Sequence, residues 1–342
     1  MLAAITDIPI KELPSAMEGM GLKKYVAAQL INWLYVRLAS SFEEMTDLSK
    51  EARALLAERY SISAVRVGSM LSAEDGTAKL CVSAADGNSF ECVLIPSDDG
   101  RVTACLSTQA GCAMGCAFCR TAEMGFIRDL TQGEIVGQFV ELARMSKSPI
   151  TNVVLMGMGE PLANVENVLS AIEIFKERRA FNISKRRITV STSGLIPELR
   201  EFVKRSEVRI AISLNATTDE VRDRIMPVNR RSPIAEIMEF AREYGATSRL
   251  RITFEYVMLR GVNDSMDDAR RLVGLLAGCS AKLNLIPFNP YEGSEFAAPD
   301  PLTVERWSEY LHDKGVQVNI RSSRGREIMA ACGQLVSENR DS

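Results

Sequence analysis

Strand-like and helix-like segments alternate from residue 102 almost to the end of the chain, and this alternation limits the possible folds more than any other feature. The strand candidates are residues 102–107, 152–157, 187–192, 208–215, 251–259, 282–289 and 316–322. Amphipathic runs such as LTQGEIVGQFVELARMS and VENVLSAIEIFKER separate most of them. Repeated strand–helix units build a parallel sheet covered by helices. About six units predict an α/β fold, a partial (β/α)6 barrel.

Two segments with other patterns precede this alternation. Residues 7 to about 60 carry apolar residues at three- and four-residue spacing, which is typical of helices. Residues 64–97 contain short apolar runs broken by EDGT, ADGN and DDGR, and Asp-Gly between such runs favours antiparallel hairpins. We therefore divide the chain into a helical accessory domain (1–62), a β-hairpin extension of antiparallel strands (63–97) and a core domain (98–337).

Composition excludes several classes of protein. Of the 342 residues, 46% are hydrophobic and 25% charged, which is typical of a soluble globular protein, and no apolar run is long enough to span a membrane. The start MLAAITDIPIKELPS does not resemble a secretion signal, so we expect a cytoplasmic protein with no membrane partner. Because His312 is the sole histidine, Ser-His-Asp catalysis and histidine-rich metal sites are poor candidates.

Short polar or glycine-rich motifs follow the predicted core strands. GMGEP follows the second strand, STSG the third, SLNA the fourth and PFNP the sixth. In parallel α/β folds the carboxyl ends of the strands meet at one edge, where ligands bind. The sequence therefore predicts a binding site at this edge.

Three cysteines lie close together in GCAMGCAFCR, at positions 112, 116 and 119. A structural zinc site usually takes four ligands and often two CxxC pairs, and no second pair is present. A redox CxxC would leave Cys112 unexplained, and a catalytic thiol would lack a histidine partner. An iron–sulfur cluster with three cysteine ligands and one open iron is the remaining interpretation.

Several motifs together resemble the RlmN/Cfr family of radical S-adenosylmethionine (SAM) RNA methyltransferases, and its RlmN members more than its Cfr members. They are CLSTQAGCAMGCAFCRTAEMGF, LMGMGEPLAN, ITVSTSGLIP, ISLNATTDEVRDRIMPVN, EYVML and ACGQL. The resemblance runs from about residue 85 to 335 and includes the CxxxCxxC signature of radical SAM enzymes. It implies a radical SAM barrel preceded by an RNA-binding accessory domain.

The resemblance also implies cofactors and their ligands. Cys112, Cys116 and Cys119 would hold a [4Fe-4S] cluster whose open iron binds SAM. The SAM-binding residues would be Gly159, Glu160, Ser191, Ser213, Leu214, Asn215 and Asn289. Many family members have histidine where Asn215 stands, and an asparagine cannot act as a general base near neutral pH.

A relay of two further cysteines is implied in the same way. Cys332 would take a methyl group from one SAM, and a radical made from a second SAM would activate that methyl group to attack the adenine. Cys105 would then form a transient disulfide with Cys332 and release the product. Either Cys105 or Glu91 would take the ring proton.

The implied substrates are adenosines in 23S rRNA, at the peptidyl-transferase centre, and in tRNA, just 3′ of the anticodon, with methylation at C2. A flavodoxin or ferredoxin system would supply electrons. Arg321, Arg324 and Arg326 precede Cys332, and we expect one of them to contact the RNA backbone. Two alternatives stay open: Cfr-type methylation at C8, and a non-enzymatic metal-containing RNA-binding protein.

Overall fold

The computed structural model describes residues 2–321 and 323–336, so Ser337, the last residue of our core domain, lies outside the described residues. One sheet of ten strands organises the core, in the order β14-β13-β12-β11-β10-β9-β6-β5-β4-β3. The strands are β3 (Val65–Ser72), β4 (Ala78–Ala84), β5 (Ser89–Pro96), β6 (Val102–Cys105), β9 (Asn152–Leu155), β10 (Ile188–Thr192), β11 (Arg209–Ser213), β12 (Ile252–Met258), β13 (Ala281–Pro287) and β14 (Val318–Ile320). The seven strands from β6 to β14 are parallel neighbours, which confirms the seven strand candidates of the core.

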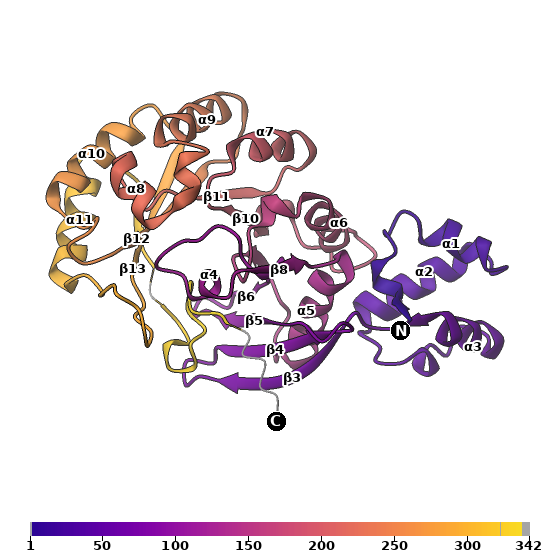
Figure 1. The fold of residues 1–342 in the computed structure, drawn as a ribbon. Coiled ribbons are helices and arrows are strands. Elements are labelled where there is room, and N and C mark those ends of the chain that lie inside the picture. The colour runs from indigo at the N-terminus through magenta and orange to yellow at the C-terminus, as the bar shows by residue number, and fades with distance from the viewer. Residues whose placement is uncertain (1, 322, 337–342) are drawn as a thin grey trace.

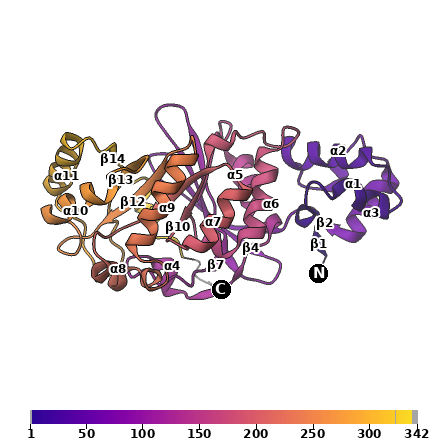
Figure 2. The same cartoon turned by 90° about the horizontal axis from the view of Figure 1, so that it is seen from above.

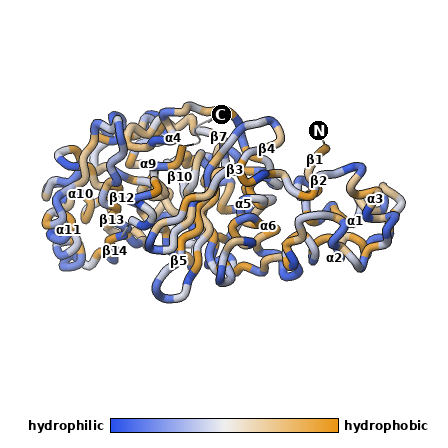
Figure 3. Tube along the Cα trace, turned by 90° about the horizontal axis from the view of Figure 1, so that it is seen from below, coloured by the Kyte–Doolittle hydropathy of each residue, from blue (hydrophilic) through white to orange (hydrophobic). Residues whose placement is uncertain are grey.

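Helices cover the outer face of the parallel strands and leave the inner face to the site (Figures 1 and 2). The outer helices are α5 (Gln132–Met145), α6 (Val165–Lys176), α7 (Ile196–Arg205), α9 (Ile234–Thr247), α10 (Met266–Leu276) and α11 (Pro301–Asp313). Two short helices, α4 (Arg120–Glu123) and α8 (Asp219–Ile225), belong to loops after strands β6 and β11. Hydrophobic residues concentrate in the strands and hydrophilic residues in the outer loops (Figure 3). The expected α/β fold with a partial barrel is confirmed.

The hairpin strands β3, β4 and β5 continue the barrel sheet. β5 pairs antiparallel with β6, with Val93 opposite Cys105. Each of the three turns from β3 to β6 has a glycine with positive φ, namely Gly76, Gly87 and Gly100. The third Asp-Gly turn therefore joins β5 to β6, so the hairpin extension and the barrel form one continuous sheet. The sequence analysis did not predict this continuity.

The amino-terminal module contains α1 (Leu13–Gly19), α2 (Tyr25–Ile31) and α3 (Lys50–Arg59), and Figures 1 and 2 show it at one end of the molecule, beside α5 and α6. Strand β1 (Ala3–Ala4) pairs with β2 (Tyr60–Ser61) and so joins the two ends of the module. The first turn of α5 fixes the module to the core, because Gly133 N–H donates to the Asp7 carboxylate at 3.0 Å and Gln132 Nε2 donates to the Thr6 carbonyl at 2.8 Å. Across residues 2–321 and 323–336, no helix has both the length and the hydrophobicity that a membrane span needs.

Contact between α5 and the hairpin strands can be tested with two glycines. A Cβ atom on Gly137 of α5 would lie 2.9 Å from Cγ2 of the buried Val65 on β3, whereas Gly274 of α10 faces open space. We expect Gly137→Ala to lower the free energy of unfolding by about 1 kcal/mol, because overpacking outweighs the gain in helix propensity. Gly274→Ala should raise it by about 1 kcal/mol. Urea unfolding measures both, and equal stabilisation by the two substitutions would contradict the packing.

Candidate active site

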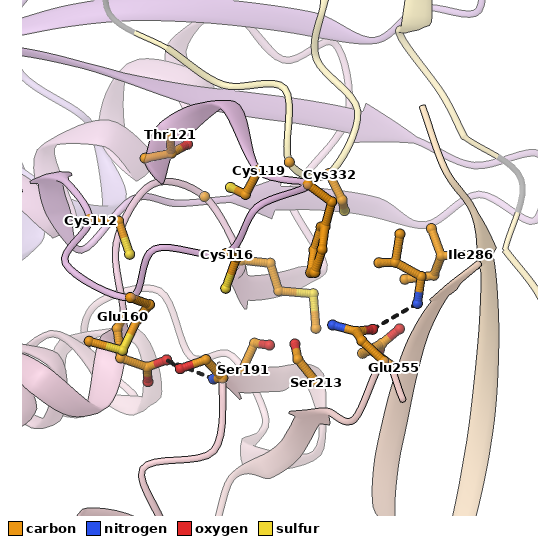
Figure 4. Close-up of a pocket in the computed structure, with 18 of the residues that line it drawn as sticks. Cys112, Cys116, Cys119, Thr121, Glu160, Ser191, Ser213, Glu255, Ile286 and Cys332 are labelled. Carbon is orange, nitrogen blue, oxygen red and sulfur yellow. Dashed lines mark hydrogen bonds between the residues drawn. The ribbon is translucent and has the colours of Figure 1, made fainter. Parts of the chain in front are cut away.

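A cavity at the carboxyl ends of the parallel strands contains most of the residues that the sequence singled out. The predicted site residues that line it are Cys112, Cys116, Cys119, Gly159, Glu160, Ser191, Ser213, Asn215, Asn289 and Cys332. Figure 4 shows Cys119 and Cys332 on one side of the cavity and Ser191, Ser213 and Glu255 along the facing side. Residues more than two hundred positions apart in the sequence therefore meet in one place.

The loop that carries the three cysteines starts from a small hairpin of β7 (Gln109–Gly111) and β8 (Phe126–Asp129). Gly111 has φ of +74°, and a Cβ atom there would lie 1.9 Å from the Gly125 carbonyl oxygen, so only glycine fits. Cys112 N–H then donates to that same carbonyl at 2.8 Å, and Ala117 N–H donates to the Ile225 carbonyl of α8 at 2.9 Å. These contacts hold the loop over the cavity.

The chemistry of these three thiols fits an iron–sulfur cluster. Burial raises the pKa of all three, that of Cys112 to about 12, so they need a bound cation to become thiolates. All three thiols line the same cavity, and a cluster of four irons can take three cysteine ligands on separate metals.

Glu160 lines the cavity, and its carboxylate accepts several hydrogen bonds. Its carboxylate accepts hydrogen bonds from Ser193 N–H at 2.7 Å, Ser193 Oγ at 2.8 Å and Leu162 N–H at 3.1 Å. Burial raises the pKa of Glu160, and these hydrogen bonds partly offset that rise. The neighbouring Gly159 has φ of +98°, and a Cβ atom on it would lie 2.7 Å from the backbone nitrogen of Gln109. The turn therefore requires a glycine at position 159.

Two buried acceptors in the cavity accept no hydrogen bond from the protein. Asn289 Oδ1 and Glu255 Oε2 are both buried without a hydrogen bond. Such atoms are costly unless a ligand satisfies them, and SAM carries the donors that could do so: an ammonium group, two ribose hydroxyls and the adenine amine. The residues of the cavity therefore fit SAM. Sequence analysis missed Glu255, although a charged residue inside the strand-like run RITFEYVML was a signal that could have found it.

Two other residues predicted to bind SAM make hydrogen bonds to other groups of the protein. Asn215 has φ of +55°, which asparagine tolerates better than most residues, and its Oδ1 accepts from Val257 N–H at 2.7 Å. Leu214 does not line the cavity: its N–H donates to the Glu255 carbonyl at 3.0 Å and its own carbonyl accepts from Arg222 Nε at 3.0 Å. Leu214 thus contributes to the packing of the strand ends.

A second cavity adjoins the first and contains the other relay cysteine. Cys105 lines it, and Cys332, Asn289 and Arg321 line both cavities. Cys105 is buried, which raises its pKa to about 12, whereas Cys332 is exposed, and all eight cysteines of the chain are free thiols. Of the three arginines expected near RNA, Arg324 also lines the second cavity and Arg326 is exposed outside both.

Glu91, a predicted proton acceptor, lines neither cavity. Its carboxylate lies 3.0 Å from Lys79 Nζ and also accepts from Val336 N–H at 3.0 Å. Lys79 Nζ in turn donates to the Met329 carbonyl at 3.3 Å. The buried pair therefore holds both ends of the segment 329–336, which carries Cys332.

The same segment is fastened to the cysteine loop from the other side. Arg120 N–H donates to the Gly333 carbonyl at 2.8 Å, and Thr121 Oγ donates to the Leu335 carbonyl at 2.6 Å. Arg120 and Thr121 directly follow Cys119. Cys332 is thus fixed beside the proposed cluster ligands and faces both cavities.

Comparison with known proteins agrees with this geometry. A model of the radical SAM superfamily matches residues 106–273, and a model of the ribosomal RNA large subunit methyltransferase N-terminal domain matches residues 4–62. The dual-specificity RNA methyltransferase RlmN of Geobacter sulfurreducens is 48% identical over 331 residues, which cover 97% of this chain and 91% of that protein. The chain belongs to the RlmN family. The protein of that name from Syntrophotalea carbinolica is 47% identical and covers 97% of this chain and 89% of its own length.

A solved structure supports the RlmN family fold. The crystal structure of a radical SAM methyltransferase from Sphaerobacter thermophilus matches with a TM-score of 0.95 and 40% identity, covering 98% of this chain and all of that one. Radical SAM enzymes of the RlmN type use a [4Fe-4S] cluster and SAM, so the cofactors expected from the sequence are confirmed.

The buried pair can be tested by removing its cation. We expect Lys79→Met to lower the free energy of unfolding by about 3 kcal/mol, because it leaves the Glu91 carboxylate buried without its partner. Trypsin should also cleave faster after the exposed Arg326, since the segment 329–336 loses an anchor. Urea unfolding and timed digestion measure the two effects.

Lys11→Met is the matched control. Lys11 pairs with Glu173 at 3.2 Å, but both side chains are well exposed. Such a pair contributes at most about 1 kcal/mol, so stability and cleavage should hardly change. Similar losses in the two variants would show that the Lys79–Glu91 pair has no special role.

Proposed function

We propose that this protein is an RNA methyltransferase that uses SAM to methylate C2 of adenosine in 23S rRNA, at the peptidyl-transferase centre, and in tRNA, just 3′ of the anticodon. The observation that carries the proposal is the position of Cys332, which lines one cavity with Cys112, Cys116 and Cys119 and a second cavity with Cys105. A methyl carrier needs access to both the source of the methyl group and its destination. The relatives' name, dual-specificity RNA methyltransferase, supports RNA as the substrate.

The three cysteines of the loop would hold the cluster, and Glu160 would accept a hydrogen bond from the ammonium group of SAM. When bound, the cluster and SAM would supply a 5′-deoxyadenosyl radical after reduction by a flavodoxin or ferredoxin system. Ser191, Ser213, Asn215 and Asn289 position the rest of SAM. The apolar part of the cavity wall, including Leu155 and Phe288, excludes water from this chemistry.

Cys332 performs the transfer. Its thiolate would displace the methyl group of one SAM, with S-adenosylhomocysteine as the leaving group. A second bound SAM and the cluster would supply the radical that removes a hydrogen atom from the S-methyl group, and would take back one electron once the carbon has bonded to C2 of the adenine. Cys105, as a thiolate, is the better placed candidate base for the ring proton, because it lines the second cavity whereas Glu91 is committed to Lys79 and Val336. The Cys105 sulfur would then bond to the Cys332 sulfur as the C–S bond breaks, the released carbon would take up the proton held by Cys105, and an external thiol would reduce the disulfide.

RNA reaches the site through the second cavity and its rim. Arg324 lines that cavity, and Arg321 lines both cavities. Phosphate contacts from arginine position a nucleic acid without reading its sequence. The accessory domain of residues 1–62 supplies a further RNA contact, remote from the chemistry.

Cysteine variants test the relay. Wild-type protein purified without oxygen should carry one extra methyl group in its intact mass, and Cys332→Ala should lose both that mass and all nucleoside methylation. Cys105→Ala should keep the methyl group on Cys332 but fail to release product. Nucleosides digested from the RNA product should contain 2-methyladenosine.

Cys279→Ala is the matched control, because Cys279 lines neither cavity, and it should behave as wild type. A methyl group that persists in Cys332→Ala would exclude Cys332 as the carrier. 8-Methyladenosine in the product would contradict the C2 assignment. A colourless protein that contains zinc and does not cleave SAM would contradict the enzymatic function altogether.

A further inference from the structure

A row of polar side chains crosses one face of the sheet from the cavity to its exposed edge. Ser213, Glu255, Asn284 and Asn319 occupy the same register on the neighbouring strands β11, β12, β13 and β14. Residues in register on parallel strands point to the same face of the sheet. Glu255 is the buried member of the row, and a buried carboxylate needs partners for both of its oxygens.

Hydrogen bonds along the row fix the orientation of Glu255. Asn319 Nδ2 donates to Asn284 Oδ1 at 3.4 Å, and Asn284 Nδ2 donates to Glu255 Oε1 at 3.0 Å. The other carboxylate oxygen, Oε2, is buried without a hydrogen bond, on a residue that is 5% exposed. The chain of hydrogen bonds from Asn319 therefore ends at Glu255, whose other oxygen lies at the first cavity and accepts no hydrogen bond.

The surroundings of this acceptor determine which donor fits. Arg321 Nη1 already lies 3.9 Å from Glu255 Oε2, so a second cation there would be repelled. Glu160 lies beside Cys112 and Cys116 of the cluster loop, whereas Glu255 lies across the cavity from them (Figure 4). A neutral donor is therefore expected at Glu255, far from the ammonium group of SAM.

We infer that Glu255 binds a ribose hydroxyl of SAM. This inference rests on the proposed function and gives a role to Glu255, which the sequence analysis included in the motif EYVML without assigning it one. The adenine amine, the other neutral donor of SAM, has its own acceptor in the unpartnered Asn289 Oδ1. Because Asn284 already donates to Oε1 of Glu255, only Oε2 is open to SAM. We therefore expect it to accept from one of the two ribose hydroxyls.

Calorimetric titration of the cluster-loaded protein under nitrogen tests the assignment, with SAM, 2′-deoxy-SAM and 3′-deoxy-SAM as probes. Wild-type protein should bind one of the two deoxy compounds about tenfold or more weakly than SAM, as expected for a lost hydrogen bond to a charged group, and the other nearly as well as SAM. Glu255→Gln replaces the free acceptor with an N–H donor. This variant should bind SAM about tenfold or more weakly than wild type does. It should bind the weaker of the two deoxy compounds as tightly as wild type does, because that compound lacks the hydroxyl that Glu255 would bind.

Glu141→Gln is the matched control, because Glu141 is an ion-paired glutamate on the outer helix α5, and it should bind all three compounds as wild type does. The wild-type comparison stands even if Glu255→Gln fails to fold. Equal affinity of wild type for SAM and both deoxy compounds would overturn the assignment, as would a Glu255→Gln variant equally weakened toward all three. Wild-type protein that binds no SAM would overturn the proposed function itself.

Discussion

The attachment of the carboxyl-terminal segment to the core is the constraint on which the site depends. Cys332 is exposed and lies on a stretch with little regular structure, so nothing local fixes its position. The buried Lys79–Glu91 pair binds the backbone of this segment from the hairpin side, and Arg120 and Thr121 bind it from the cluster loop. Loss of either set would separate the carrier thiol from the radical chemistry.

This constraint also gives the hairpin strands a function. β4 and β5 extend the barrel sheet beyond its first parallel strand and bring Lys79 and Glu91 under the segment 329–336. The two cavities share Cys332, Asn289 and Arg321, so in the function proposed above radical chemistry and methyl transfer would take place side by side. A carrier fixed at the shared wall needs only a small movement to serve both, which limits the exposure of a reactive carbon to water.

Features set by local sequence could be predicted, and features set by long-range pairing could not. The seven parallel strands follow from alternating periodicity, and the close placement of the three cysteines at one cavity follows from their spacing within one loop. Glu91 was one of two candidate bases, with Cys105, and its pairing with Lys79 could not be foreseen, because it depends on the register of β4 and β5, which places the two diagonally on one face. The free oxygen of Glu255 depends in the same way on Asn284, a residue of the next strand.

The route of the methyl group through Cys332 is the central claim, and an isotope measurement tests it most directly. RNA is methylated with SAM whose methyl group carries three deuterium atoms, after the carrier has turned over enough to lose its original methyl group. A hydrogen atom is lost from the S-methyl group of Cys332 before the carbon bonds to adenine, so the methyladenosine should retain two deuterium atoms by mass spectrometry. Retention of all three would show direct transfer from SAM and would contradict the relay.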